Sequence, residues 1–213
     1  MKWTMFDYIS NPSDIYSCSF KQIRNQANFD GMCDGQINVA VRLIHACGML
    51  DIVKDLRFSA GAVKVGKKTL ETSTQIFVDS EMVGSGIIKS QLSLGSRICC
   101  TLNNRNNIKY AKERGMTRSA VAVDEWVDHL GGAIVVFGNA PTALFRLLEL
   151  LNQGVIKPAL ILAFPVGFVG AEESKKAVCE FSCGVPYITL LGRRGGSAIA
   201  AAAVNALSFS SNE

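Results

Sequence analysis

One of the chain's two histidines, His45, lies in the mostly apolar stretch 41–49, where its imidazole could carry proton-transfer chemistry. Imidazole titrates near neutral pH, so a partly buried histidine can give or accept a proton where few other side chains can. Arg42 precedes it by three residues, which places both side chains on one face of a helix that ends near Gly48. By spacing alone, a lone histidine is more often a core or capping residue than a catalytic one.

The cysteines show no pattern that favours metal binding or disulfide bonds. There are seven of them, without a CxxC pair. Cys99 and Cys100 are adjacent in an apparent strand and point to opposite faces, while Cys179 and Cys183 share a helical face with no histidine nearby. We therefore expect reduced thiols that pack as small apolar residues, and no bound metal.

Common cofactor and nucleophile motifs are missing from the sequence. There is no GxxxxGKS/T segment, no GxGxxG after a strand, and residues 192–197 have the wrong glycine spacing for either. The GxSxG nucleophile elbow is also absent. The sequence therefore disfavours nucleotide-dependent and α/β-hydrolase chemistry, and we expect no cofactor.

Length and composition indicate one large domain, residues 1–213, with 48% hydrophobic and 19% charged residues. No run reaches the roughly eighteen apolar residues of a membrane span, and residues 1–8 lack the apolar core of a signal peptide. We therefore expect a cytoplasmic protein that does not bind membranes. The net charge of +4 is dispersed, which disfavours nucleic-acid binding and suits a small polycarboxylate ligand.

Short, β-rich apolar runs alternate with helical patterns along most of the chain. The runs are residues 74–78, 98–102, 133–137, 159–163 and 187–191, and the helical patterns between them include 118–130, 141–151 and 171–183. This alternation predicts a doubly wound, three-layer α/β sandwich around a five-stranded parallel sheet. Two earlier helical patterns, at 13–28 and 34–47, predict an N-terminal helical layer or arm.

Three of the predicted strands lead into loops of one design, rich in glycine or proline and followed directly by a helix. The loops are residues 138–142, 165–170 and 192–197. All three should open at the carboxyl edge of the sheet, where ligands of such folds bind. Glycine lets a backbone approach a ligand closely, and helix N-termini offer free N–H groups to anions. An alanine-rich helix, 198–207, follows the last loop and suits close packing against the sheet or a second subunit.

Six segments form an ordered set within a match that extends from about residue 8 to residue 207. They are VRLIHACGM at 41–49, DLRFS at 55–59, TRSA at 117–120, GNAPTALFRL at 138–147, FPVGFVGAEESK at 164–175 and GRRGGSA at 192–198. Together they resemble the precorrin-8X methylmutase (precorrin isomerase) family, which includes the cobalt-precorrin-8 methylmutases. A single loop would be a moderate signal, whereas six in order are a strong one.

The resemblance implies an isomerase of cobalamin biosynthesis with a flavodoxin-like fold. Members of the family move a methyl group from C11 to C12 of the corrinoid ring. They convert precorrin-8X to hydrogenobyrinic acid, or the cobalt-bearing equivalent to cobyrinic acid, and are homodimers with the site near the subunit interface. The family histidine falls on His45, and it is regarded as protonating or hydrogen-bonding a ring nitrogen to promote a 1,5-sigmatropic shift.

Six side chains are candidates for contact with the substrate. Ser19, Arg24 and Arg118 fall on segments that the resemblance implies are substrate-binding, and Arg42, Arg193 and Arg194 are candidates by their positions beside His45 and on the glycine-rich loop. Arg42 could either anchor a peripheral carboxylate or satisfy nearby acids. Of the adjacent pair Arg193 and Arg194, one could face the ligand and the other solvent or the dimer partner. Two residues depart from the family pattern: Lys89 stands where arginine is expected, and Glu81 adds an acid near the predicted site.

The reaction agrees with the residues present. A methyl migration within a conjugated macrocycle needs no redox cofactor and no external nucleophile, but it needs a flat apolar cavity and a proton donor. The main alternative is a non-catalytic tetrapyrrole-binding or carrier protein on the same scaffold. A flavodoxin-like protein that binds a flavin or nucleotide is less favoured, because no phosphate loop is visible.

Overall fold

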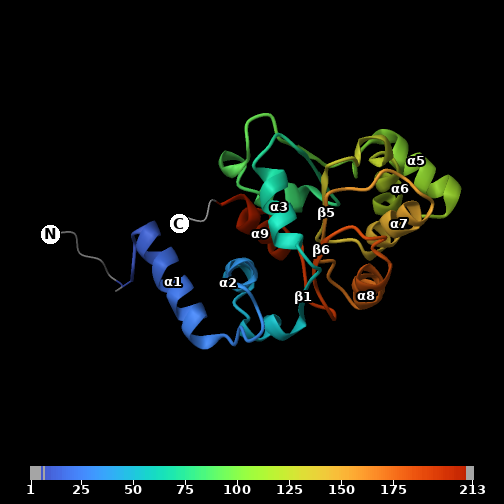
Figure 1. Cartoon of the computed structure of the whole chain (residues 1–213). Coiled ribbons are helices and arrows are strands. Elements are labelled where there is room, and N and C mark those ends of the chain that lie inside the picture. The colour runs from blue at the N-terminus through green and yellow to red at the C-terminus, as the bar shows by residue number, and fades with distance from the viewer. Residues whose placement is uncertain (1–5, 7, 210–213) are drawn as a thin grey trace.

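The computed structural model describes residue 6 and residues 8–209, so the expectation for residues 1–8 lies almost entirely outside the described part. Figure 1 shows a sheet with helices on both of its faces and one helix, α1, that extends away from this body. This is the three-layer sandwich that the alternation of strands and helices predicts. Among the described residues, no helix is both long enough and apolar enough to cross a membrane.

In the described part of the chain the sheet has six strands, in the order β1-β6-β5-β4-β2-β3. Their bounds are β1 Leu56–Phe58, β2 Gln75–Val78, β3 Arg97–Cys99, β4 Ile134–Phe137, β5 Leu160–Ala163 and β6 Tyr187–Leu190. Strands β2 to β6 pair with one another in parallel. Counted from β2, they follow the flavodoxin-like order 2-1-3-4-5. All five predicted strands are confirmed.

The prediction of a five-stranded, wholly parallel sheet is wrong in one respect. Strand β1 adds a sixth strand, antiparallel to β6, at the edge of the sheet. Leu56 is buried and Arg57 exposed, but three residues are too few to show a strand alternation in the sequence. An antiparallel edge strand on an otherwise parallel sheet is a common addition to folds of this class.

Two layers of helices cover the sheet. One face carries α2 (Asp34–Cys47), α3 (Ala62–Leu70), α4 (Glu81–Gly86) and α9 (Ser197–Ser208), and the other carries α6 (Arg118–Asp124), α7 (Pro141–Asn152) and α8 (Ala171–Phe181). Along β4, Ile134 and Val136 join the first core, while Val135 and Phe137 join the second. Central strands are therefore buried on both faces, which is why they are continuously apolar.

Two stretches on the second face differ from the prediction. The helical pattern at 118–130 divides into α6 and a 3-10 helix, Val127–His129. Between them Trp126 is buried, stacks on Phe77 with ring centroids 5.3 Å apart, and donates its indole N–H to Thr101 Oγ1 over 2.9 Å. The asparagine-rich stretch 103–107 contains the start of α5 (Arg105–Arg114), a helix that was not among the predicted ones. Its many charged and amide side chains hide the helical period.

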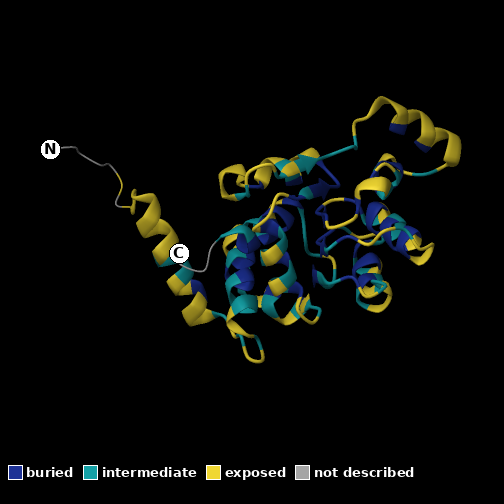
Figure 2. Cartoon of the chain, turned by 45° about the horizontal axis from the view of Figure 1, so that its top comes forward, coloured by how far each residue is buried: buried dark blue, intermediate teal, exposed yellow. Residues whose placement is uncertain are grey.

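Helix α1 (Pro12–Gln26) is an arm rather than part of a layer. Asn11 caps it by accepting the N–H groups of Ser13 and Asp14, and Pro12 suits its first turn. The helix contacts α2, and Ile23 is its buried anchor, while most of its length is exposed (Figure 2). The N-terminal helical arm is therefore confirmed.

Candidate active site

A small cavity of about 250 Å³ lies where α1, α2 and α9 meet the end of α4. Its wall on α9 includes the small side chains Ala198, Ala201 and Ala202, and Gly86 faces them. A Cβ atom at Gly86 would lie 2.7 Å from the Cβ of Ala201, so this close approach requires glycine. Because α9 begins at the loop that follows β6, and Ala198 in its first turn lines the cavity, the cavity lies near the carboxyl edge of the sheet, where such folds bind ligands.

His45 lines this cavity and is exposed to solvent, so its ring is not sealed in the core. Its Nδ1 lies 2.8 Å from Ser19 Oγ. The rings of Tyr16 and Phe20 lie 5.3 and 5.4 Å from the imidazole centroid. These three residues share one face of α1, which therefore holds the imidazole. With the serine hydroxyl at Nδ1, Nε2 is the nitrogen left for a ligand, an arrangement suited to proton transfer.

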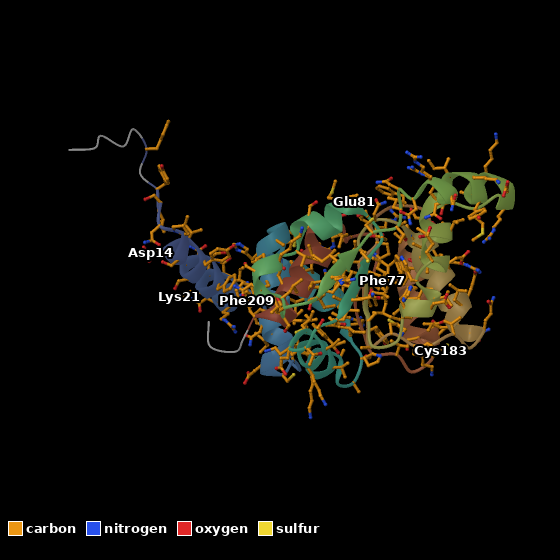
Figure 3. All side chains as sticks on the ribbon, turned by 90° about the horizontal axis from the view of Figure 1, so that it is seen from above. Asp14, Lys21, Phe77, Glu81, Cys183 and Phe209 are labelled. Atoms are coloured by element: carbon orange, nitrogen blue, oxygen red, sulfur yellow. The ribbon has the colours of Figure 1, made fainter. Side chains whose placement is uncertain are left out.

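Two of the predicted site arginines lie on α1 and α2. Arg42 lines the same cavity, and its guanidinium carbon lies 3.7 Å from the ring centroid of Phe209, which Figure 3 labels close to α1. Arg24 donates from Nη2 to Asn38 Oδ1 over 2.6 Å, which links α1 to α2. The structure therefore groups Arg42 with His45 and places Arg24 at the contact between the two helices.

Asn205 fixes one wall of the cavity and was not selected from the sequence. Its Nδ2 donates to the carbonyl oxygen of Gly86 over 3.0 Å, and its Oδ1 accepts the N–H of Ile88 over 2.8 Å. All three residues line the cavity. Since both ends of the amide are engaged, Asn205 sets the separation between α9 and the segment after α4. The available signal was a single amide in an otherwise alanine-rich helix.

Asp79 lies at the topological switch point of the sheet, directly after β2 and beside the end of β4. Its carboxylate accepts the N–H groups of Gly138, Asn139 and Ala140 over 3.0, 2.8 and 2.7 Å. Burial raises the pKa of Asp79, although the three hydrogen bonds act in the opposite direction. Asp79 was not among the predicted site residues, and the available signal was an acid directly after a buried strand.

The Gly-rich loop (residues 192–196) between β6 and α9 packs closely against the end of β5. A Cβ atom at Gly195 would collide with the carbonyl oxygen of Phe164, so glycine is required there. The N–H of Gly196 donates to the same oxygen over 2.8 Å. The loop backbone is thus held in one position at the carboxyl edge of the sheet.

The remaining predicted arginines lie away from the cavity that contains the histidine. Arg194 pairs with Asp51 and Asp55, each over 2.8 Å. Its neighbour Arg193 is exposed. Arg118 begins α6, in the helix layer on the opposite face of the sheet. The structure does not bring these three side chains into the small cavity.

Comparison with known proteins gives one consistent family. The family model described as precorrin-8X methylmutase matches residues 14–209. The chain is 54% identical over 203 residues to the precorrin-8X methylmutase of Pseudomonas aeruginosa, covering 95% of this chain and 98% of that protein. It is 44% identical over 202 residues to the precorrin-8X methylmutase of Sinorhizobium sp., covering 95% and 96%.

A solved structure agrees with the sequence comparisons. The crystal structure of the precorrin-8x methyl mutase from Thermus thermophilus matches this fold with a TM-score of 0.83 at 36% sequence identity, and the match covers 92% of this chain and 94% of that one. All the residues expected to form the site lie inside the region that the family model matches. The chain belongs to the precorrin-8X methylmutase family.

Proposed function

We propose that this protein is an isomerase of cobalamin biosynthesis that moves a methyl group from C11 to C12 of precorrin-8X or cobalt-precorrin-8. The product is hydrogenobyrinic acid or cobyrinic acid, respectively. Family membership supports the reaction class. The observation that carries the proposal is the exposed imidazole of His45, held at Nδ1 by Ser19 beside a largely apolar cavity.

His45 is the proton donor in this proposal. Substrate and product are isomers, so the bond from the methyl carbon to C11 breaks as the bond to C12 forms, and no atom is gained or lost. Nε2 donates its proton toward a ring nitrogen, which draws electron density through the conjugated ring and favours the migration. The proton returns to the imidazole before the next turnover. Ser19 orients the ring, and its distance of 2.8 Å from Nδ1 favours this role over substrate contact.

The substrate's peripheral carboxylates require cations around the cavity. We assign Arg24, Arg42, Arg118 and Arg193 to this role, because a guanidinium binds a carboxylate through two parallel hydrogen bonds. The positive net charge of +4 also favours a polyanionic ligand. Arg118 lies on the far helix layer, so a ligand that reaches it must extend across the carboxyl edge of the sheet.

We further propose that the protein acts as a homodimer. The cavity of about 250 Å³ is smaller than the roughly 300–1,000 Å³ that encloses drug-sized ligands, so one chain holds only an edge of a macrocycle. Helix α1 and the residues before it leave apolar side chains exposed, among them Tyr8, Ile9, Ile15 and Tyr16. Both observations support a second copy that covers this arm and completes the cavity.

Replacement of His45 tests the proton-donor assignment. Loss of a positioned acid should lower conversion of precorrin-8X by about 10²- to 10⁴-fold in His45→Ala, while binding of hydrogenobyrinic acid is retained. Conversion is followed by the change in the visible spectrum. His129→Ala is the matched control, because His129 is the other histidine and is exposed in a 3-10 helix away from the cavity.

Other results of these assays would contradict separate parts of the proposal. Undiminished conversion by His45→Ala would refute the proton-donor role. Wild-type protein that binds corrinoid with no conversion would instead indicate the carrier alternative. Parallel assays with metal-free and cobalt-containing substrate would show which of the two this enzyme uses.

A further inference from the structure

We infer that Arg194 is a positioning residue that, together with Lys175, holds the Gly-rich loop against the segment following the His45 helix, and that Arg193 is the cation the loop presents to a substrate carboxylate. The inference rests on the proposed function and deepens it. It assigns different roles to two adjacent arginines that the sequence does not distinguish.

The side chain of Arg194 is engaged within the chain. Its Nη1 donates to Asp51 Oδ2 and its Nη2 to Asp55 Oδ2, each over 2.8 Å. Both acids belong to the 3-10 helix η1 (Leu50–Asp55), which begins two residues after Gly48, the C-cap of α2. The hydrogen bond from Arg194 lowers the pKa of Asp51. The guanidinium therefore joins the Gly-rich loop to η1 by two charge-assisted bonds.

The backbone of Arg194 is held from the other side by a buried lysine. Lys175, in α8, has an exposed fraction of 0%, and its Nζ donates to the carbonyl oxygen of Arg194 over 2.6 Å. Glu172 and Asp55 are the acids whose charges act on this amine. An ammonium group is costly to bury unless it is paired and hydrogen-bonded. The hydrogen bond from the Lys175 ammonium group therefore fixes the peptide unit that contains the carbonyl group of Arg194.

Arg193 has the opposite surroundings. Its carbonyl oxygen accepts the N–H of Gly167 over 3.1 Å, so its backbone is anchored. Its side chain is exposed, and the guanidinium carbon lies 5.2 Å from the ring centroid of Phe168, itself 83% exposed. Within the described residues, Arg193 forms no ion pair. A cation on a fixed backbone, stacked on an aromatic ring, is ready to bind a carboxylate.

The position of the loop explains how Arg194 acts on binding without touching the ligand. The loop leads directly into α9, where Ala198, two residues after Gly196, lines the cavity. The ion-pair cluster of Arg194 with Asp51 and Asp55 also ties this loop to η1. Helix η1 in turn follows α2, the helix that carries His45. The cluster therefore fixes the start of the α9 wall relative to the imidazole.

Binding and stability measurements on matched variants test this division. Hydrogenobyrinic acid and cobyrinic acid are each titrated by visible absorption, the one that wild-type protein binds serves as the probe, and Tm is measured by circular dichroism. We expect Arg193→Gln to weaken binding about tenfold or more with unchanged Tm. Arg194→Gln and the double variant Asp51→Ala/Asp55→Ala should each lower Tm and weaken binding by the same factor. Combining them should weaken binding no further, because residues of one cluster act non-additively.

Lys175→Met should weaken ligand binding by the same factor as Arg194→Gln. In a protein that already carries Arg194→Gln, Lys175→Met should weaken binding no further. Lys176→Met is its control, because Lys176 is an exposed neighbour paired with Glu172.

Three results would overturn the inference. Weak binding by Arg194→Gln with wild-type affinity in Asp51→Ala/Asp55→Ala would mean that Arg194 contacts the ligand itself. Wild-type affinity in Arg193→Gln would remove that residue's role. If the decreases in Tm of Arg194→Gln and Asp51→Ala/Asp55→Ala were strictly additive in the combined variant, these side chains would not form one cluster. Failure of wild-type protein to bind both hydrogenobyrinic acid and cobyrinic acid would contradict the proposed function and the role of Arg193, while the Tm data would still decide whether Arg194, Asp51 and Asp55 form one cluster.

Discussion

Helices α1 and α9 line the same cavity but are held in very different ways. Helix α9 packs against α2, α3 and α4 and against the central strands, and most of its residues are buried. Helix α1 contacts α2 and is exposed along most of its length. Figure 2 shows the contrast as a largely yellow arm beside a body whose inner surfaces are dark blue.

The difference separates the residues that stabilise the fold from those that serve the chemistry. Helix α9 gives the cavity its shape, and its small side chains are part of the hydrophobic core. Helix α1 contributes the hydroxyl and the two rings around His45 while burying little surface. Substitutions in α9 should therefore change the free energy of unfolding, and substitutions in α1 should change turnover.

The largest effect is expected from a bulky residue on the buried side of α9. Ala203 has an exposed fraction of 0%, so Ala203→Leu forces extra carbons into a filled core and should lower the free energy of unfolding by about 3 kcal/mol. Ala198→Leu is the matched control, because Ala198 is on the same helix but exposed at the cavity. It should leave stability nearly unchanged and reduce corrinoid binding. Urea denaturation and ligand titration measure both, and equal stability losses would contradict the division.

Lys175, which holds the loop before α9, gives a pH-dependent effect of intermediate size. Burial lowers the pKa of Lys175 from 10.5 to about 8. Between these two values the unfolded chain binds more protons than the folded one, so stability should rise as pH increases through this window. From pH 8 to 9.5 the gain should be about 1.6 kcal/mol relative to Lys175→Met.

Urea denaturation at the two pH values measures that gain. Lys176→Met should keep the wild-type slope, because pairing with Glu172 raises the pKa of Lys176 above the window. A wild-type protein whose stability has the same pH slope as Lys175→Met would show that this amine titrates normally.

The smallest effect is expected on α1. Ser19→Ala removes the hydroxyl that lies 2.8 Å from His45 Nδ1, and should lower kcat about tenfold, or ~1.4 kcal/mol, with Tm unchanged. Ser17→Ala is the control, because residues two apart on a helix do not face the same way and Ser17 is exposed. A loss of Tm rather than of kcat in Ser19→Ala would show that α1 stabilises the fold after all.

Much of the architecture could be read from the sequence because its signals are local. The central strands β4 and β5 are continuous apolar runs, and α2 ends where Gly48 adopts a positive φ of 70°. Strand β1 was missed because its three residues pair with the distant β6. Helix α5 was missed because its exposed residues carry no apolar period.

By itself, the sequence determined the five parallel strands, the long helices α1, α2, α7, α8 and α9, the family, and His45 as the candidate donor, since each depends on neighbouring residues or on short motifs. Only the tertiary structure decided which side chains meet. Ser19 and His45 are 26 positions apart, and Asp51 and Arg194 are 143 apart. The orientation of the imidazole and the distinct surroundings of Arg193 and Arg194 arise from contacts between distant segments, which no local pattern of residues encodes.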